Sequence, residues 1–334
     1  EEQALFLQGG DLRNPPKGAF EIHGAGGKTV TGLLDKGICN VIFSDGPAGV
    51  NIANQVKALP GGGFAPSQVP ERYSWGVMGE AMQAKLKQIP GDAVYRYATA
   101  WPVEMLLAQT WNLPLLQRVG EAVGEEMLAF GITIWLAPGM NIHRNPLGGR
   151  TFEYYSEDPV LTGEMAAALT KGVQSHEGIG TCMKHFCCNN TEDNRNYISS
   201  NVSERALREI YLKGFEIAVK KSRPKAVMSS YNMLNHIYTA NRHDLLTDIL
   251  RCEWGFEGFV MTDWGSTNEK AGEPGKCAVS GNDLVMPGSD FDWKGILDAI
   301  RSGELDQKTL RRSACRILRL MLAANTPVLV GKEQ

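Results

Sequence analysis

The sequence predicts an α/β fold, a TIM-type (β/α)8 barrel whose first part is irregular or incomplete, and three observations lead to it. From about residue 95 onward, short apolar runs rich in β-branched residues alternate with longer segments of helical period, which is the pattern of repeated βα units. Six or more such units in a chain of 334 residues favour a barrel over an open doubly wound sheet. The Gly-rich stretches at 24–27 and 61–63 follow no clear strand, so a dinucleotide-binding fold is not favoured.

Six short apolar runs are the candidate strands, and each is followed by a loop rich in polar residues. In chain order they span residues 40–44, 133–136, 180–184, 226–229, 258–262 and 283–286. Their length and composition are those of buried strands in a parallel sheet. We therefore expect them to form the centre of the fold.

Three segments have apolar residues at helical spacing, and we expect their apolar stripes to cover the sheet. They span residues 115–130, 207–218 and 310–321. Asn112 and Pro114 precede the first segment and Ser203 precedes the second, and these residue types commonly begin a helix.

The chain reads as one barrel domain over residues 1–334, with a loop-rich start at 1–95 and regular βα units at 96–324. Proline and glycine punctuate the first part, as in Pro15-Pro16 and the stretch 60–63, where turns and surface excursions are expected. No internal repeat is visible.

The composition excludes several classes of partner. The 34 basic and 37 acidic residues leave a net charge of −3, which attracts neither nucleic acid nor an anionic membrane, and no apolar run approaches the roughly 20 residues of a membrane span. The seven cysteines lie mostly among apolar neighbours, as reduced core thiols do, which favours a cytoplasmic protein. Because the chain begins with Glu1 rather than Met, a secreted form with a cleaved signal stays open.

Metal and cofactor sites are not expected. Cys187 and Cys188 are adjacent, but no CxxC motif or paired Cys/His spacing accompanies them, so a structural place in the core is the preferred interpretation. The sequence also lacks GxSxG, HExxH and Walker motifs, which argues against the corresponding hydrolases and nucleotide-binding proteins.

Polar side chains follow several of the predicted strands at the point where each strand ends. They are Asp45, Lys184 with His185, Tyr231 and Asp263. In a barrel, the carboxyl ends of the strands carry the chemistry. One carboxylate at a strand end is more often a helix cap or an ion-pair partner, but several such groups at one rim favour a ligand site because their burial is costly unless they are used.

The residue types at this rim suit a carbohydrate. Asp263 is followed by Trp264, and the C–H faces of a sugar pack on aromatic rings. Asp45 offers an acceptor for two adjacent hydroxyl groups. Donors are available from Arg150, Lys184 and His185.

Seven motifs along the chain resemble, in the same order, the successive motifs of glycoside hydrolase family 3 β-glucosidases. They are SDGPAGV (44–50), LAPGMNIHRNPLGGRTFEYYSEDP (136–159), KHFCCNNTEDNR (184–195), SERALREIYLKGFEIAVKKSRP (203–224), VMSSYNMLN (227–235), GFVMTDWGS (258–266) and GNDLVMPG (281–288). The resemblance extends from about Leu33 to Ala324.

This resemblance implies a role for each residue that matches a family motif. Asp263 corresponds to the nucleophile that attacks the anomeric carbon, in a retaining mechanism. Arg150 and Lys184 would favour its charged form, and Tyr231 would hold the attacking oxygen in line. The positions that correspond to sugar-binding residues are Asp45, Arg150, Lys184, His185 and Tyr231, with Trp264 at the wall of the site and Met286 at its floor.

The chain departs from the family pattern in one respect. The general acid/base of these β-glucosidases is a Glu on a second, α/β sandwich domain, and no such domain is expected within these 334 residues. Glu153, Glu157 and Glu192 match positions that are structural or adjacent to the substrate. A second domain that supplies the acid, on the same full-length polypeptide or another, is therefore an expected partner, and a homo-oligomer stays open.

The leading hypothesis is an exo-acting β-glucosidase for cello-oligosaccharides and other β-glucosides, with Asp45 gripping the outer hydroxyl groups of glucose. The alternatives are a β-xylosidase or arabinosidase of the same family, and a sugar-binding barrel that is inactive without its acid/base domain. The N-acetylglucosaminidase branch is not favoured, because Lys184-His185-Phe186 is followed by Cys187-Cys188 without a second His.

Overall fold

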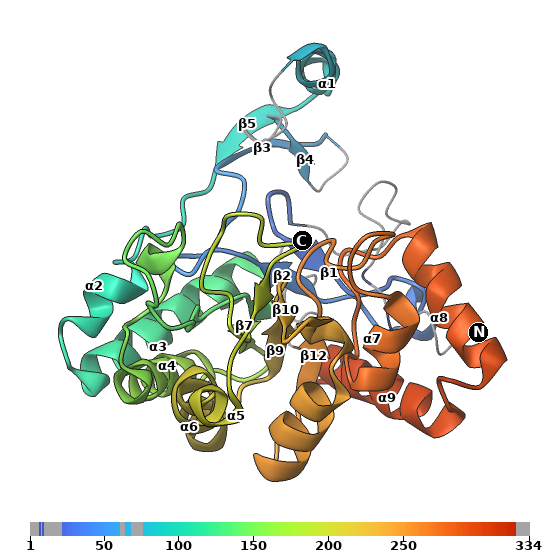
Figure 1. Cartoon of the computed structure of the whole chain (residues 1–334). Helices are drawn as coiled ribbons and strands as arrows, with labels where there is room; N and C mark the ends of the chain where they lie inside the picture. Colours follow the sequence, from blue (N-terminus) through green and yellow to red (C-terminus); the bar gives the residue numbers. More distant parts are fainter. Residues whose placement is uncertain (1–6, 8, 10–21, 61–63, 68–75, 325–334) are drawn as a thin grey trace.

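Short buried runs form the sheet at the centre of the molecule (Figure 1). The computed structural model describes residues 7, 9, 22–60, 64–67 and 76–324. In this part of the chain the main sheet has six strands in the order β1-β2-β6-β7-β9-β12. They are β1 (Gly27–Lys28), β2 (Ile42–Ser44), β6 (Ile134–Trp135), β7 (Gly180–Phe186), β9 (Ala226–Ser229) and β12 (Phe259–Met261).

The strands β2, β6, β7, β9 and β12 are parallel, and β1 pairs antiparallel with β2 at one edge. The carboxyl ends of five strands therefore meet on one side of the sheet. The predicted α/β class is confirmed. A closed (β/α)8 barrel is not confirmed, because the strands of the described residues form a half-barrel.

The predicted strand at residues 283–286 is reduced to one parallel bridge, between Leu284 and Met261. The cause is the fully buried side chain of Asp283, whose Oδ2 accepts the backbone N–H of Val260 at 2.9 Å. A regular ladder would use that N–H for a backbone carbonyl. The segment consequently runs beside β12 without becoming a strand.

Asp283 also joins three elements through a buried ion cluster. Its Oδ2 accepts from Nη2 of Arg251 at 2.5 Å, and its Oδ1 accepts from Nη1 of Arg316 at 2.8 Å. Arg251 lies on η7 (Asp244–Glu253), a helix of π type, and Arg316 lies on α9 (Gln307–Ala323). The carboxylate therefore holds both helices to the end of the sheet.

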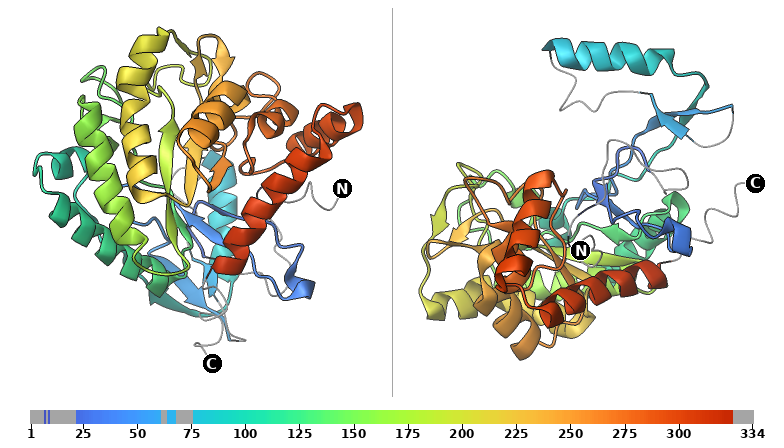
Figure 2. Two further views of the ribbon diagram at one scale, coloured as in Figure 1. Left: turned by 90° about the horizontal axis from the view of Figure 1, so that it is seen from below. Right: turned by 90° about the vertical axis from the view of Figure 1, so that its right-hand side faces the viewer.

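Three helices lie next to one another outside the sheet (Figure 2, left). They are α3 (Leu113–Phe130), α4 (Pro159–Val173) and α6 (Lys213–Ser222). The predicted helices at 115–130, 207–218 and 310–321 are confirmed, in α3, in the segment that ends with α6, and in α9. Asn112 caps α3 by accepting the N–H of Leu115 at 3.0 Å, and Asp158 caps α4 by accepting that of Val160 at 2.7 Å. These caps satisfy N–H groups that lack a partner within the helix.

Two glycines let α3 and α4 approach closely. A Cβ atom on Gly172 would lie 2.0 Å from the carbonyl oxygen of Gln117, and one on Gly120 would lie 2.2 Å from that of Leu169. No side chain fits at these distances. The pair of helices therefore packs backbone against backbone, and large side chains fill the core beside this contact.

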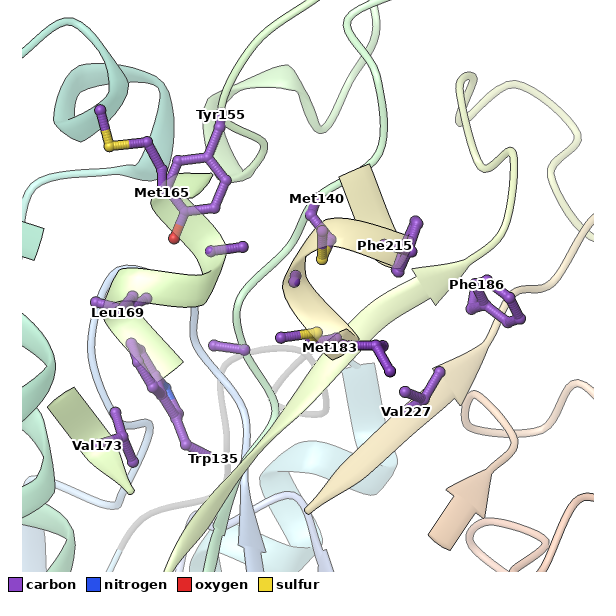
Figure 3. Close-up of a cluster of buried hydrophobic side chains, with 14 of the residues drawn as sticks. Trp135, Met140, Tyr155, Met165, Leu169, Val173, Met183, Phe186, Phe215 and Val227 are labelled. Atoms are coloured by element: carbon purple, nitrogen blue, oxygen red, sulfur yellow. The ribbon is translucent and has the colours of Figure 1, made fainter. Parts of the chain in front are cut away.

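That core lies between the sheet and the helices α4 and α6 (Figure 3). Trp135, Met183 and Val227 extend from the strands, and Leu169 and Phe215 extend from the helices. All five are nearly or completely buried. This apolar layer fixes the strands whose carboxyl ends carry the polar groups described below.

A smaller unit projects from the carboxyl end of β2 (Figure 1). Its antiparallel sheet has the order β4-β3-β5. The chain then returns to the main body, where the backbone N–H of Trp101 donates to the carbonyl oxygen of Ala48 at 2.8 Å. The unit consists of β3 (Gln55–Ala58), β4 (Phe64–Pro66), α1 (Gly76–Gln88) and β5 (Asp92–Tyr95). We call residues 54–98 the excursion.

The remaining elements are short or lie around the rim and the far end of the sheet. They are η2 (Leu34–Lys36), α2 (Glu104–Ala108), η4 (Thr151–Glu153), β8 (Ser199–Ser200), α5 (Glu204–Ala206), η5 (Leu207–Tyr211), β10 (Met233–Leu234), β11 (Ile237–Tyr238), η6 (Thr239–Asn241), α7 (Pro274–Ser280) and α8 (Asp290–Ser302). None of the helices in the described ranges is long and apolar enough to cross a membrane.

All seven cysteines are free. Cys182, Cys187, Cys188 and Cys277 are buried, Cys39 and Cys315 are half-buried, and Cys252 is exposed. Cys252 is near the end of η7, which leads to the first residue of β12. This thiol is therefore on the side of the sheet opposite the carboxyl ends of the strands.

Candidate active site

The predicted polar residues follow the strands at their carboxyl ends. Asp45 comes directly after β2, Lys184 and His185 are near the carboxyl end of β7, Tyr231 follows β9, and Asp263 follows β12. Because these strands run parallel in one sheet, all five residues lie at the same rim.

Asp263 is the carboxylate around which the other groups gather. It is 7% exposed, and its Oδ1 accepts the backbone N–H of Trp264 at 2.7 Å. Its Oδ2 is buried and has no hydrogen bond with any other described residue. Nε2 of His185 lies 3.5 Å from this oxygen. One carboxylate oxygen is thus anchored and the other is available for chemistry.

The protonation of Asp263 reflects two opposing effects. Burial raises its pKa from 3.8 to about 6, while the charges of Arg150 and Lys184 lower it. The two cations act in the predicted direction, but the loss of water around the carboxylate outweighs them. At pH 7 the carboxylate is still mostly ionised, as a nucleophile must be.

Lys184 and Asp45 form a pair across the rim. Lys184 is almost fully buried, and its Nζ donates to Oδ1 of Asp45 at 2.5 Å. Burial opposes the charge on Lys184, but the Asp45 carboxylate raises the pKa of this lysine above its usual value. Burial is the largest effect on Asp45 and raises its pKa, but Lys184, the backbone of Gly46 and Arg150 together lower that pKa below its usual value. Both groups are therefore charged, and the half-exposed Asp45 side chain still faces outward.

Arg150 is held by acidic residues that the sequence placed near the rim. Its Nε donates to Glu153, and it lies 3.9 Å from Oε1 of Glu192. The other oxygen of Glu192 accepts from Nη1 of Arg195 at 2.6 Å. Glu153 and Glu192 are thus paired with arginines, while Glu157 is exposed in the following loop.

Tyr231 and Arg195 close the rim beside Asp263. The Tyr231 hydroxyl donates to the backbone oxygen of Trp264 at 2.7 Å, and the guanidinium of Arg195 lies 4.4 Å from the centre of the Tyr231 ring. Burial, and then the charge of Asp263, raise the pKa of Tyr231. The tyrosine therefore stays protonated and fixes the loop that follows Asp263.

Trp264 and Met286 lie together against β1. The indole Nε1 of Trp264 donates to the oxygen of Gly26 at 3.1 Å. A Cβ atom on Gly27 would lie 2.8 Å from the Trp264 ring and 2.7 Å from the terminal methyl group of Met286. The two side chains form an apolar surface beside the carboxylate.

Three residues of the site have no role in the sequence-based predictions. Tyr154, Asn189 and Arg195 lie inside the quoted motifs, but their spacing gives no sign of where their side chains point. In the fold, Tyr154 contacts His185, with its hydroxyl 3.1 Å from Nδ1, and Asn189 donates to that hydroxyl at 3.2 Å. Only the packing of the 141–158 loop on β7 could reveal these partners.

Cavity volume does not locate this chemistry. A cavity of about 560 Å³, lined in part by Lys225, Trp254 and Arg316, lies at the amino ends of the strands. A cavity of about 10 Å³ lies beside Arg150 and Tyr154. The clustering of buried charged groups, not hollow volume, identifies the carboxyl rim as the candidate active site.

Comparisons with known proteins identify relatives of the chain. The family model "Glycosyl hydrolase family 3 N terminal domain" matches residues 85–320. Thermostable beta-glucosidase B of Acetivibrio thermocellus is 46% identical over 228 residues, which are 68% of this chain and 30% of that protein. An exo-alpha-(1->6)-L-arabinopyranosidase of Bifidobacterium longum is 46% identical over 217 residues, 65% of this chain and 28% of that protein.

A solved structure extends the likeness to nearly the whole chain. The structure of beta-glucosidase 3B from Thermotoga neapolitana in complex with glucose has a TM-score of 0.79 and 42% sequence identity. The match covers 97% of this chain and 41% of that one. The chain therefore spans less than half the length of the relatives that it matches.

Proposed function

Because the chain belongs to glycosyl hydrolase family 3, we propose that it is the nucleophile-bearing barrel of a retaining, exo-acting β-glucosidase. The substrate is a terminal, non-reducing β-D-glucosyl residue, as in cello-oligosaccharides. The observation that carries the proposal is the Asp263 carboxylate, which is buried among cations with one oxygen anchored by Trp264 and the other unbonded within the described residues.

In the proposed reaction, Asp263 attacks the anomeric carbon and forms a covalent glycosyl-enzyme. The bond to the leaving oxygen breaks, and this oxygen takes a proton from a general acid. Water then attacks the anomeric carbon and gives a proton back to the general acid, the ester bond to Asp263 breaks, and the carboxylate is regenerated. The pKa of about 6 leaves Asp263 ionised at neutral pH.

The rim residues would hold the sugar during these steps. The Asp45 carboxylate and the Lys184 ammonium suit adjacent outer hydroxyl groups, and Arg150 adds a donor at the same rim. The apolar face of the sugar would pack on Trp264, with Met286 behind it. His185 and Tyr231 complete the proposed subsite.

The general acid is proposed to come from a second, α/β sandwich domain, on the same polypeptide or another. Two facts support this: Glu153 and Glu192 are engaged with arginines, and the chain spans about 30% of the Acetivibrio relative. We further propose that residues 1–334 are one domain and that its barrel closes with segments beyond the six described strands. The seven free thiols support a cytoplasmic location.

The decisive experiment is trapping with a 2-fluoro glucoside that carries a good leaving group, followed by mass spectrometry of the labelled peptides. Such a substrate does not need the general acid. We expect a label on the peptide that contains Asp263 in the wild type and no label in Asp263→Ala. A label elsewhere, or an equal label in the variant, would refute Asp263 as the nucleophile.

Specificity for a xyloside or an arabinoside is the second candidate. The Bifidobacterium longum relative, an exo-alpha-(1->6)-L-arabinopyranosidase, supports it in part. A panel of nitrophenyl glycosides separates these specificities. A xyloside or arabinoside that labels or turns over faster than the glucoside would replace the glucose assignment.

The isolated chain would also fit a sugar-binding or assembly module that requires its acid/base domain for turnover. Calorimetry with glucose, combined with a cellobiose assay, distinguishes the two cases. Glucose binding without trapping or hydrolysis would favour the binding module, and rapid cleavage of cellobiose would exclude it.

A further inference from the structure

Three buried side chains form a row that is joined by two hydrogen bonds and leads to Asp263. Asn189 Nδ2 lies 3.2 Å from the Tyr154 hydroxyl, this hydroxyl lies 3.1 Å from His185 Nδ1, and His185 Nε2 lies 3.5 Å from Asp263 Oδ2. Tyr154, His185 and Asn189 are each at most 3% exposed. Water therefore does not compete for these bonds.

The direction of the row follows from the Asn189 amide. Its Nδ2 also faces Oε1 of Glu192 at 3.4 Å, and an ionised carboxylate only accepts hydrogen bonds. Turning the amide over would place two oxygens against each other. Asn189 is therefore a donor to the Tyr154 oxygen, and Nδ1 of His185 is the acceptor that the hydrogen bonds of the described residues leave for the Tyr154 proton.

The charge state of His185 completes the argument. Burial, and then Arg150 and Lys184, hold the pKa of His185 well below its usual range, and Arg195 adds to this effect. The imidazole is neutral, so it carries one proton. Because Nδ1 accepts from Tyr154, that proton is on Nε2, the nitrogen that faces Asp263.

We propose that Tyr154, oriented by Asn189, fixes His185 as the Nε2–H tautomer, and that His185 thereby positions Oδ2 of Asp263. With Trp264 N–H on Oδ1, this second donor sets the plane of the carboxylate. The distance of 3.5 Å is long for a hydrogen bond, and such contacts often shorten when substrate binds. The consequence for catalysis rests on the proposed function, whereas the tautomer itself does not.

A neutral donor has an advantage at this place. Asp263 faces the imidazole, Glu153 and Glu192 lie near Tyr154, and the cations that act on His185 are Arg150, Lys184 and Arg195. A fourth positive charge would have to be desolvated beside these three cations. A directed N–H orients the nucleophile without that cost, and Tyr154 is the group that makes the direction unique.

The first test is nitrogen-15 NMR of the histidine side chains in the full chain. His185→Gln identifies the resonances of His185 among the six histidines. We expect a neutral His185 with its proton on Nε2. A proton on Nδ1, or a charged ring at pH 7, would overturn the proposal in the wild type alone, without any variant at Tyr154.

The second test compares Tyr154→Phe with Tyr238→Phe. Tyr238 donates to backbone oxygens of Asn196 and Lys270 at the surface and serves as the matched control. In Tyr154→Phe we expect mixed His185 tautomers and labelling by the 2-fluoro glucoside that is about 10- to 100-fold slower, with glucose affinity within about threefold of wild type. The control should match the wild type in all three measurements.

The outcomes separate this proposal from the proposed function. An unchanged tautomer and labelling rate in folded Tyr154→Phe would overturn the positioning role. A Tyr154-dependent Nε2–H tautomer in a chain that no glycoside labels would instead uphold the hydrogen-bonded row and refute the assigned chemistry.

Discussion

At the scale of single residues, the charged groups at the rim have pKa values that are shifted in different directions by their surroundings. Lys184 and Asp45 are paired at 2.5 Å and both remain charged. Asp263 has cations nearby but no direct ion pair with a lysine or arginine among the described residues, and burial raises its pKa to about 6. Asp263, the proposed nucleophile, is thus the group of this trio that titrates nearest to neutral pH.

This pKa predicts an acidic limit to reactivity. Only the ionised carboxylate attacks, so the rate of labelling by the 2-fluoro glucoside should be constant above about pH 7 and fall about tenfold per pH unit well below pH 6. Single-turnover rates between pH 4.5 and 8 measure this. A rate that stays constant down to pH 4.5 would contradict the raised pKa.

The same shift predicts that Asp263 destabilises the fold at neutral pH. Its folded pKa is above the unfolded one, so the cost is absent below about pH 4, grows as the pH rises, and is complete above about pH 6. Asp263→Asn should therefore raise the free energy of unfolding at pH 7 by up to about 3 kcal/mol, and much less at pH 4. Urea titrations at both pH values measure this, with the exposed Asp298→Asn as control.

Most residues of the candidate site follow from the sequence because a strand end places them. Asp45, Lys184, His185 and Asp263 all come at or after the last residues of apolar runs. Their partners do not follow, because Tyr154 and Arg195 reach the site from loops whose path depends on tertiary packing. The neutral state of His185 follows first from its burial, which also depends on tertiary packing.

At the scale of elements, one helix contact and one interrupted strand were not predictable from the sequence pattern. The helices α3 and α4 meet at Gly120 and Gly172, a contact that apolar periodicity does not predict. The segment at 283–286 has the composition of a strand, but the Asp283 side chain interrupts its ladder. Each feature depends on a local detail, the missing Cβ atoms of the two glycines in one case and the Asp283 carboxylate in the other. A hydrophobic pattern averaged over several residues does not reveal such details.

Gly172→Ala should destabilise the protein because its Cβ would lie 2.0 Å from a backbone oxygen. Separating the two helices enough to admit a methyl group should cost about 1–3 kcal/mol or more. Gly32→Ala is the control, since a Cβ there meets nothing within 4 Å. Thermal unfolding of both variants measures the difference, and equal Tm values would show that the helices adjust freely.

Asp283→Asn should be more damaging than loss of a surface ion pair. The change leaves Arg251 and Arg316 without their shared carboxylate, and breaking a buried pair costs about 3–5 kcal/mol. Arg205→Gln removes an exposed contact with Glu209 and should cost at most about 1 kcal/mol. Denaturant unfolding compares them; similar losses would mean that the cluster contributes little.

At the scale of the whole molecule, the sequence predicts the α/β class but not the extent of the sheet. Alternation of short strands and helices is local, whereas closure of a barrel depends on which distant strands pair. The excursion shows the same limit. The sequence predicts a loop-rich segment at residues 1–95, but the structure has the three-stranded sheet β4-β3-β5 within it. Its strands are short, and β3 and β5 show little alternation of apolar and polar residues.

Binding of glucose should stabilise the whole chain if the rim is a sugar subsite. A ligand at 100 times its Kd stabilises the folded state by about 2.7 kcal/mol, so Tm should rise with glucose concentration. Asp45→Ala should lose most of this rise, and Asp35→Ala, at an exposed position on η2, should keep it. An equal rise in both variants would remove Asp45 from the subsite.

Cys252 offers a way to attach the protein in a chosen orientation. It is the exposed cysteine, while the other six are buried or half-buried, and it lies where η7 leads to the amino end of β12. A maleimide reagent or a gold surface that reacts with accessible thiols should therefore capture the molecule by the end opposite its carboxyl rim. A film of molecules tethered through Cys252 would present the carboxyl rim of every molecule to the solution.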